Sequence, residues 1–373
     1  MRKSLRYMLI FLISLALLVY IGTWWFTRQP QFGKLPGGER LARIERSPNY
    51  HNGAFRNQVP TPNFSNGGNF FRVFYEFALK ADKRNIPTDS IPHVKTDLHA
   101  LSPAEDILVW FGHSSYFIQL NGKRILVDPV FNRNASPVSF TTKSFLGAHA
   151  YGVEDIPAID FLIITHDHWD HLDFRTVSAL MPKVSAAYCP LGVGAHLEHW
   201  GYPARNVHES DWGETTSLPG GLTLHTTPAR HFSGRGLKRN TSLWASYVLQ
   251  SSLRKIYIGG DSGMGPHFAK IGAQHGPFDL AILENGQYNP YWENIHTRPE
   301  QVLEAAQQLQ AREVLPVHAA KFSLSNHAWD DPLVRITEAN RSAGLRILTP
   351  RIGEIVQLGD STQQFSEWWR GLK

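Results

Sequence analysis

The chain has 373 residues, enough for one large domain or two ordinary ones, and its 42% hydrophobic and 18% charged residues are typical of a folded protein. The net charge of +5 comes without a Lys/Arg block in the body of the chain, so nothing favours nucleic-acid binding. The single cysteine, Cys189, excludes an internal disulfide framework and a Cys-rich zinc site. Its apolar neighbours predict a buried structural thiol.

The N-terminus carries a candidate membrane anchor. Three basic residues within the first six positions precede residues 7–26, which carry no charge. A helix of roughly 20 apolar residues is long enough to cross a bilayer core. A cleaved signal peptide begins in the same way, but this stretch ends in bulky Trp24 and Trp25 without a small-x-small cleavage site. We therefore expect an uncleaved single-pass anchor, with the rest of the chain extracytoplasmic, on the periplasmic side in a bacterium.

Residues 28–66 are rich in Pro, Gly, Asn and Gln, which indicates a linker that becomes an extended arm over the domain surface. The next segment, 70–80, predicts a helix on which Phe70, Phe74 and Phe77 share one stripe. Such a stripe either packs on its own domain or touches membrane or lipid. The predicted division is an anchor at 1–27, a linker, arm and aromatic helix at 28–104, and a folded domain at 105–373.

From Asp106 onward, short strands and helices interleave. Strands are predicted at 107–110, 116–120, 124–127, 161–164, 222–226, 242–249, 255–258, 279–283 and 314–317. Asn121-Gly122 indicates a hairpin turn between the second and third of these strands. Helices are predicted at 173–180 with Asp173 as N-cap, after a capping box from Thr297 to Glu300, and from Asp331 to Gly344. Strands in runs, punctuated by helices, predict an α+β fold of two sheets covered by outer helices.

The segment Thr165–His171 concentrates potential metal ligands directly after an apolar run that indicates a buried strand. Because side chains alternate along extended backbone, His166, His168 and Asp170 can point the same way, with His171 on the turn behind them. Imidazoles with a carboxylate are the ligand set of zinc and related divalent ions. A polar loop that is rich in His by chance is the alternative, but its side chains would be poorly satisfied against a strand.

Three further candidate ligands, His231, Asp261 and His318, each follow a predicted apolar strand. Taken singly, they have ordinary structural explanations as a loop residue, a turn former in a Gly-rich bend and a satisfied core histidine. Together they repeat the arrangement of the first cluster, in which a His or Asp stands at the end of a strand. We therefore expect all of these side chains to converge on one site.

These residues make the chain resemble the metallo-β-lactamase superfamily. Its His-x-His-x-Asp-His signature stands at 166–171, and its later His, bridging Asp and final His match His231, Asp261 and His318 in order. The resemblance runs from about residue 108 to 358 and implies a four-layer αβ/βα sandwich with a two-metal site at one edge. Within the superfamily, the chain is most similar to the N-acylphosphatidylethanolamine-hydrolysing phospholipase D group and the related ascorbate-6-phosphate lactonase type. The motifs that carry this similarity lie at 110–115, 126–131, 292–300 and 318–322.

The resemblance assigns ligands to two divalent ions per chain: His166, His168 and His231 to one, Asp170, His171 and His318 to the other, with Asp261 bridging. Zinc is the favoured metal, with manganese and iron as alternatives for the same ligand types. A single hydrolytic zinc needs only three protein ligands, so this many candidates also argue for two ions. Two such ions can activate water at neutral pH and clamp both oxygens of a displacement.

Two residues are candidates for catalysis, and two others for support. Asp170, already an expected ligand, would also orient the nucleophile. His296 is not needed as a ligand and would donate a hydrogen bond or proton near the leaving group, or bind a phosphate. Its ordinary explanation is a neighbour of the helix start. His113 and Asp128 are expected to orient the metal ligands through hydrogen bonds.

The resemblance implies a membrane-anchored phosphodiesterase of the phospholipase D type, with N-acylated or related phospholipids as substrates and the lipid bilayer as partner. A lactonase or ester hydrolase for a soluble, phosphorylated metabolite is the first alternative. A non-catalytic metal-binding scaffold is the second, although a structural site needs only one closed ion. A nuclease is disfavoured because the chain has no basic patch.

Overall fold

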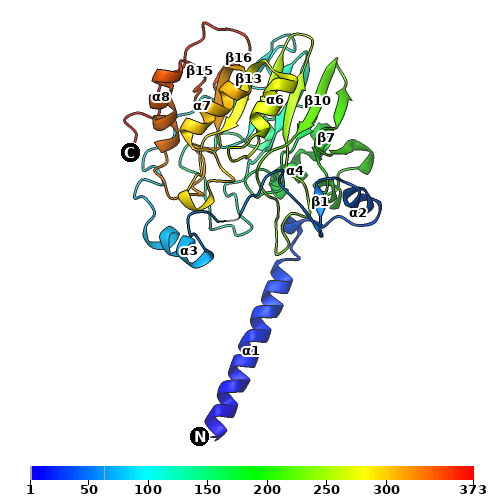
Figure 1. Cartoon of the computed structure of the whole chain (residues 1–373), viewed down its shortest axis with the longest axis vertical. Coiled ribbons are helices and arrows are strands. Elements are labelled where there is room, and N and C mark those ends of the chain that lie inside the picture. Colours follow the sequence, from blue (N-terminus) through cyan, green and yellow to red (C-terminus); the bar gives the residue numbers. More distant parts are fainter. Residues whose placement is uncertain (1, 63) are drawn as a thin grey trace.

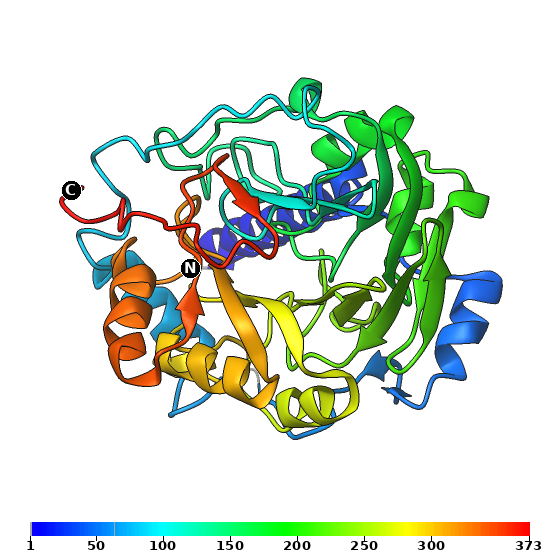
Figure 2. The ribbon, with the colours of Figure 1, turned by 90° about the horizontal axis from the view of Figure 1, so that it is seen from above.

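The computed structural model describes residues 2–62 and 64–373. Two seven-stranded sheets face each other, and helices lie on their outer sides (Figures 1 and 2). The first sheet has the order β16 (Ile355–Gln357), β3 (Ile107–Trp110), β4 (Tyr116–Leu120), β5 (Lys123–Val127), β6 (Ile159–Ile163), β7 (Val184–Pro190) and β8 (Val207–Ser210). The second has the order β15 (Arg346–Ile347), β14 (Ala311–Val317), β13 (Phe278–Glu284), β12 (Lys255–Ile258), β11 (Ser246–Gln250), β10 (Leu222–Thr227) and β9 (Thr215–Leu218).

Alternation along the strands builds the hydrophobic layers. In and after β6, Ile163 faces the core between the two sheets, whereas Leu162 and Ile164 face the helices outside. The central strands are apolar on both faces because both faces are covered. The helices over the first sheet are α4 (Phe174–Leu180) and α5 (Gly194–His199), and those over the second are α6 (His267–His275), α7 (Pro299–Gln308) and α8 (Asp331–Ala343). The predicted four-layer αβ/βα sandwich is therefore confirmed.

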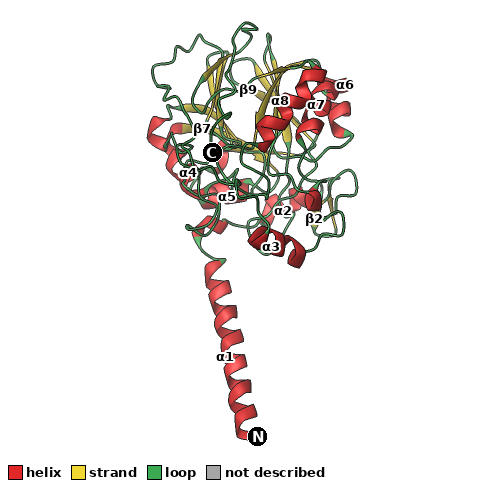
Figure 3. Cartoon of the chain, turned by 90° about the vertical axis from the view of Figure 1, so that its left-hand side faces the viewer, coloured by secondary structure: helices red, strands yellow, loops and turns green. Residues whose placement is uncertain are grey.

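The N-terminal part begins with α1 (Arg2–Phe26), a straight helix that projects away from the body of the molecule (Figures 1 and 3). Its span Lys3–Phe26 is long and apolar enough to cross a membrane, and its most apolar window buries no surface in the protein. A signal sequence at the N-terminus would have the same length and composition. The anchor therefore stays a prediction.

The predicted arm folds more than its composition indicates. Helix α2 (Gly38–Glu45) and a small hairpin of β1 (Tyr50–His51) and β2 (Ala54–Phe55) lie in the segment expected to be extended. Ile44 and Phe55 are fully buried against the domain. The sequence did not predict α2 because it has only eight residues, and its stability comes from this tertiary contact.

The aromatic helix is present as α3 (Phe70–Leu79), at the end of the body from which α1 projects (Figure 1). Phe71 and Leu79 are 81% and 71% exposed. The side chains of Phe70 and Phe77, on which the predicted stripe partly rests, lie outside the described residues. The choice between packing and lipid contact for this stripe stays open.

Several local predictions are confirmed. Asn121 and Gly122 both have positive φ between β4 and β5, as a two-residue hairpin loop requires. The Asp173 side chain accepts a hydrogen bond from the backbone N–H of Thr176 at the start of α4. Helix α8 ends at Gly344 in the left-handed conformation.

Two predictions are wrong at their boundaries. The strand expected at 242–249 begins only at Ser246, because the N–H groups of Leu243 and Ala245 donate to Leu191 and Thr165 instead of a neighbouring strand. The capping box is displaced by one residue. The N-cap of α7 is Arg298, whose N–H donates to the Gln301 side chain, because Thr297 is held by Glu284.

Candidate metal centre

The segment Thr165–His171 turns sharply between β6 and α4. The backbone N–H groups of His171 and Leu172 both donate to the His168 carbonyl, at 3.1 and 2.8 Å. Because the chain reverses directly after the strand, its polar side chains gather at one edge of the sheet. This edge is where the sandwich presents the other predicted ligands.

His166, His168 and His231 form one group of ring nitrogens. The Nε2 atoms of His166 and His231 lie 2.9 and 3.1 Å from Nδ1 of His168. Nδ1 of His231 lies 2.9 Å from the Ile295 carbonyl oxygen, which can only accept. That hydrogen bond places the proton on Nδ1 and turns the Nε2 lone pair toward the other two rings. Nitrogens that face a common point suit a divalent cation.

Asp170, His171 and His318 form a second group. Oδ2 of Asp170 lies 3.6 Å from Nε2 of His171 and 4.0 Å from Nε2 of His318. The same oxygen lies 2.9 Å from Nε2 of His113. The two groups come from strand ends and loops of both sheets, as the sequence predicts.

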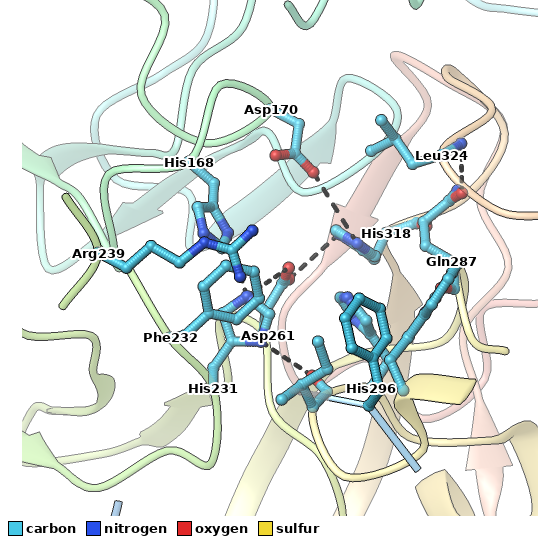
Figure 4. A pocket seen from close by; sticks show the side chains of 13 residues that line it. His168, Asp170, His231, Phe232, Arg239, Asp261, Gln287, His296, His318 and Leu324 are labelled. Atoms are coloured by element: carbon cyan, nitrogen blue, oxygen red, sulfur yellow. Dashed lines mark hydrogen bonds and ion pairs between the residues drawn. The ribbon is translucent and has the colours of Figure 1, made fainter. Parts of the chain in front are cut away.

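Asp261 lies between the groups (Figure 4). Its Oδ2 is 3.9 Å from Nε2 of His166 and 3.7 Å from Nε2 of His231. Its Oδ1 is 3.1 Å from Nε2 of His171 and 3.1 Å from Nδ1 of His318. Each carboxylate oxygen thus faces one group, which is the geometry that a bridging ligand needs. The structure brings all seven predicted ligands together, and their role as ligands stays a prediction.

The donor set fits divalent metal ions on its own chemistry. Among the described residues, Nε2 of His171 and Oδ1 of Asp261 are buried and make no hydrogen bond. Leaving a buried polar atom without a hydrogen-bond partner costs about 1–3 kcal/mol, a penalty that a bound cation would remove. The pKa of His166 is well below its ordinary value, mainly because the ring is buried and also because the positive charge of the neighbouring His171 opposes protonation. The ring is therefore neutral at pH 7, the form in which imidazole binds metal.

Asp128 holds the segment Thr165–His171 through three hydrogen bonds. Its carboxylate accepts hydrogen bonds from the Thr165 backbone N–H at 2.8 Å and the Thr165 hydroxyl at 2.6 Å. It also accepts the Nδ1–H of His171 at 2.8 Å, which leaves Nε2 of that ring for the site. Asp128 and His113 thus touch the expected ligands, in the positions predicted for orienting residues.

Sequence reasoning missed Glu284, which ends β13 and is 3% exposed. Its Oε2 lies 2.7 Å from Nδ1 of His296, and its Oε1 accepts the Thr297 N–H at 2.8 Å. Burial raises the pKa of Glu284 well above its ordinary value and lowers the pKa of His296. The contact with Glu284 engages Nδ1 of His296 and leaves Nε2 of that ring without this partner. The signal was present, since Glu284 follows an apolar strand as the predicted ligands do.

A cavity of about 260 Å³ opens above the site. Its floor includes the predicted ligands His168, Asp170, His231, Asp261 and His318 (Figure 4). Its walls are largely apolar, with Arg239 as a cationic group, and comprise Phe64, Phe232, Arg239, Gln287, Trp292, Ile295, His296 and Leu324. Such a cavity accepts an anionic group beside an apolar one.

The variant His296→Gln tests whether His296 acts in catalysis and not as a metal ligand. We expect kcat for a soluble phosphodiester to fall about 100- to 10,000-fold, because general acid–base groups contribute factors of this size. We expect the metal content to stay unchanged, because His296 is not needed as a ligand. The matched control is His225→Gln, on β10, where the ring bonds Thr215 outside the cavity. Loss of one ion in His296→Gln would make His296 a ligand, and unchanged kcat would remove it from the reaction.

The two facing sheets with a His/Asp site at their edge define a metal-dependent hydrolase fold. The chain belongs to the family described as the beta-lactamase superfamily domain, which matches residues 123–319. The fold and its His/Asp groups imply divalent metal ions.

Two of three similar proteins match over most of the chain. An uncharacterized protein of Mycobacterium tuberculosis is 36% identical over 330 residues, 87% of this chain and 88% of the relative. The N-acyl-phosphatidylethanolamine-hydrolyzing phospholipase D 1 of Caenorhabditis elegans is 29% identical over 302 residues, 76% of this chain and 84% of the relative. Outer membrane protein RomA of Klebsiella pneumoniae is 56% identical over 107 residues, 29% of this chain and 81% of that protein. The resemblance to the phospholipase D group is thereby confirmed.

Solved structures agree with the fold. Igni18, a metallo hydrolase of Ignicoccus hospitalis, superposes with a TM-score of 0.52 at 21% identity, covering 68% of this chain and 98% of that one. CmlA, a diiron beta-hydroxylase of Streptomyces venezuelae, superposes with a TM-score of 0.52 at 21% identity, and the match covers 69% of this chain and 55% of CmlA. One architecture thus carries different reactions, and the residues of the site determine which reaction takes place.

Proposed function

We propose that this chain is a membrane-anchored, binuclear metal-dependent phosphodiesterase of the phospholipase D type, acting on N-acylated or related phospholipids. The observation that carries the proposal is Asp261, whose two oxygens face two separate groups of ligands on the floor of a largely apolar cavity. A pair of ions suits the displacement at a phosphodiester, and apolar walls suit an acyl chain. The relative from Caenorhabditis elegans, named for hydrolysis of N-acyl-phosphatidylethanolamine, supports this substrate class.

The metal pair would be held by the seven predicted ligands, with zinc favoured and manganese or iron as alternatives. When bound, two divalent ions supply charge for the phosphate oxygens and lower the pKa of a water. The chain's own residues do the rest. Asp170, fixed by His113 at 2.9 Å, orients the nucleophile. His296, with its Glu284 partner, presents a donor to the leaving oxygen, and Arg239 at the cavity wall offers a positive charge to an anionic headgroup.

The anchor and the domain division complete the proposal. Residues 1–27 hold the chain in a bilayer, 28–104 form the arm and aromatic helix, and 105–373 form the hydrolase domain, outside the cytoplasm. The support is the apolar span of α1, which buries none of its most apolar window against the protein. The name of the relative RomA, an outer membrane protein, points to a membrane setting for that protein.

A substrate panel tests the proposal. The full chain, purified in detergent and loaded with zinc, is incubated with N-acylphosphatidylethanolamine, phosphatidylcholine and a set of lactones. We expect release of phosphatidic acid from the first lipid, and its loss when a chelator removes the metal. Lactone opening without phosphatidic acid would instead support the ester hydrolase alternative. One metal ion per chain and no hydrolysis would indicate the scaffold.

A further inference from the structure

Arg235 is a buried arginine that lines neither the cavity nor the ligand groups. It is 4% exposed and lies four residues after His231. Its Nη1 donates to the carbonyl oxygens of Asp167 and Leu172, at 2.9 and 2.6 Å. These two residues bracket the segment 168–171, which carries three of the seven predicted ligands. One guanidinium nitrogen therefore joins the two ends of the ligand loop.

The other edge of the same guanidinium faces the N-terminal segment. Its Nε and Nη2 both donate to the Gln31 carbonyl, at 3.1 and 2.8 Å. Gln31 lies in the short 3-10 turn η1 (Pro30–Phe32), which follows α1 after three residues. The Trp200 indole N–H donates to the Pro30 carbonyl at 2.8 Å, and the Lys34 N–H donates to Nδ1 of His196 at 3.1 Å.

Aromatic rings continue this connection from the helix to the ligand loop. Phe26, the last residue of α1, contacts Phe32 with ring centroids 5.1 Å apart, and Phe32 contacts Trp169 at the same distance. The Arg235 guanidinium lies 4.0 Å from the Trp169 ring centroid and 5.1 Å from that of Trp200. Trp169 stands between the predicted ligands His168 and Asp170. The segment after α1 thus packs directly on the loop that carries the ligands.

We propose that Arg235 is a positioning residue that clamps both ends of the ligand loop and ties it to residues 30–34, so that the seating of the segment after α1 sets the geometry of the metal site. This inference rests on the proposed metal-binding function. Arginine is required because its planar fork reaches three carbonyl oxygens from two edges at once. A lysine ammonium keeps the charge but offers its three donors from a single point.

The test uses the full chain in detergent, with Arg235→Met and Arg235→Lys as the direct variants. Zinc affinity is measured by competition with a chelator, and amide exchange of Leu172 is measured in the metal-free protein. We expect both variants to bind zinc about 10- to 100-fold more weakly, as when other partners of metal ligands are removed. The Leu172 amide should exchange faster, because its bond to His168 depends on the clamp. With a soluble phosphodiester, kcat should fall while KM stays constant, since Arg235 does not line the cavity.

A second variant perturbs the clamp from the N-terminal side. Gly33 has φ +70°, and an added Cβ would lie 2.1 Å from Nδ1 of His196, so Gly33→Ala displaces the segment without touching a ligand. We expect weaker zinc binding in this variant too, with a smaller loss of affinity than in Arg235→Met. The matched control is Arg43→Ala in α2, which breaks the exposed ion pair of Arg43 with Glu214 and should leave zinc affinity and Leu172 exchange unchanged.

Wild-type zinc affinity and wild-type Leu172 exchange in a folded Arg235→Met protein would overturn the inference. If that variant does not fold, an unchanged Gly33→Ala protein would overturn it equally. Neither measurement needs lipid hydrolysis. The two proposals can therefore fail separately. If the wild-type protein binds zinc but hydrolyses no phospholipid, and Arg235→Met and Gly33→Ala both weaken zinc binding, the substrate proposal is rejected and this inference is kept.

Discussion

Replacing Asp261 with alanine will abolish metal-dependent hydrolysis. We expect kcat to fall about 1,000-fold or more, because the substitution removes a carboxylate that faces both groups of predicted ligands. The loss also leaves His171 and His318 without the oxygen that lies 3.1 Å from each. Metal content, measured by mass spectrometry of the purified chain, should drop below two ions.

The matched control for Asp261→Ala is Asp211→Asn. Asp211 is also a buried aspartate, 7% exposed, but it bonds Asn49 and the Trp212 N–H away from the site. We expect the control to keep its metal and its turnover. Unchanged turnover and two ions in Asp261→Ala would refute the bridging assignment.

Replacing Asp170 with asparagine should cost about 100- to 10,000-fold in kcat. Burial acts to raise the pKa of Asp170, but His171 and His113 hold it well below its ordinary value. The group is thus a carboxylate at neutral pH. The amide keeps the shape and one oxygen that can accept from His113, but it removes the charge, so it cannot orient a nucleophile as an anion. We expect a smaller effect on metal content than in Asp261→Ala.

Asp160→Asn serves as the control for Asp170→Asn. Asp160, a partly exposed residue near the start of β6, pairs with Lys123 at 3.0 Å and accepts the Arg124 backbone N–H at 2.9 Å. The asparagine amide oxygen can still accept that N–H, and an exposed ion pair contributes little, so the exchange should be nearly neutral. Turnover of Asp170→Asn equal to that of Asp160→Asn would exclude Asp170 from the reaction. A larger loss at pH 6 than at pH 8 is not expected, because the lowered pKa keeps Asp170 ionised across that range.

Features that depend on residues close together in the chain could be predicted from the sequence. The hairpin at Asn121-Gly122 follows from two residues that tolerate positive φ, and the end of α8 follows from Gly344. The cluster at 166–171 follows a buried strand, and its strand-end position made it recognisable as a ligand loop. The repetition of that pattern at His231, Asp261 and His318 was enough to predict one shared site.

Contacts between distant segments could not be read in the same way. The partner of His296 is Glu284. Its strand-end position marked it as a possible site residue, but nothing local showed that it pairs with His296 or that it holds Thr297 and displaces the predicted cap. The arm helix α2 forms because Ile44 finds an apolar site made by residues far along the chain.

By itself, the sequence carried the resemblance to the family and, with it, the expected two-sheet architecture. The His and Asp residues at strand ends also predicted one shared site, because that signal lies in the short-range order of apolar and polar residues. Only the tertiary structure decided that Glu284 pairs with His296 and that Arg235 ties the ligand loop to the segment after α1. The physical reason is that the Arg235 hydrogen bonds join residues 63, 68 and 204 positions apart in the chain, and no local pattern specifies which distant carbonyl a buried donor will reach.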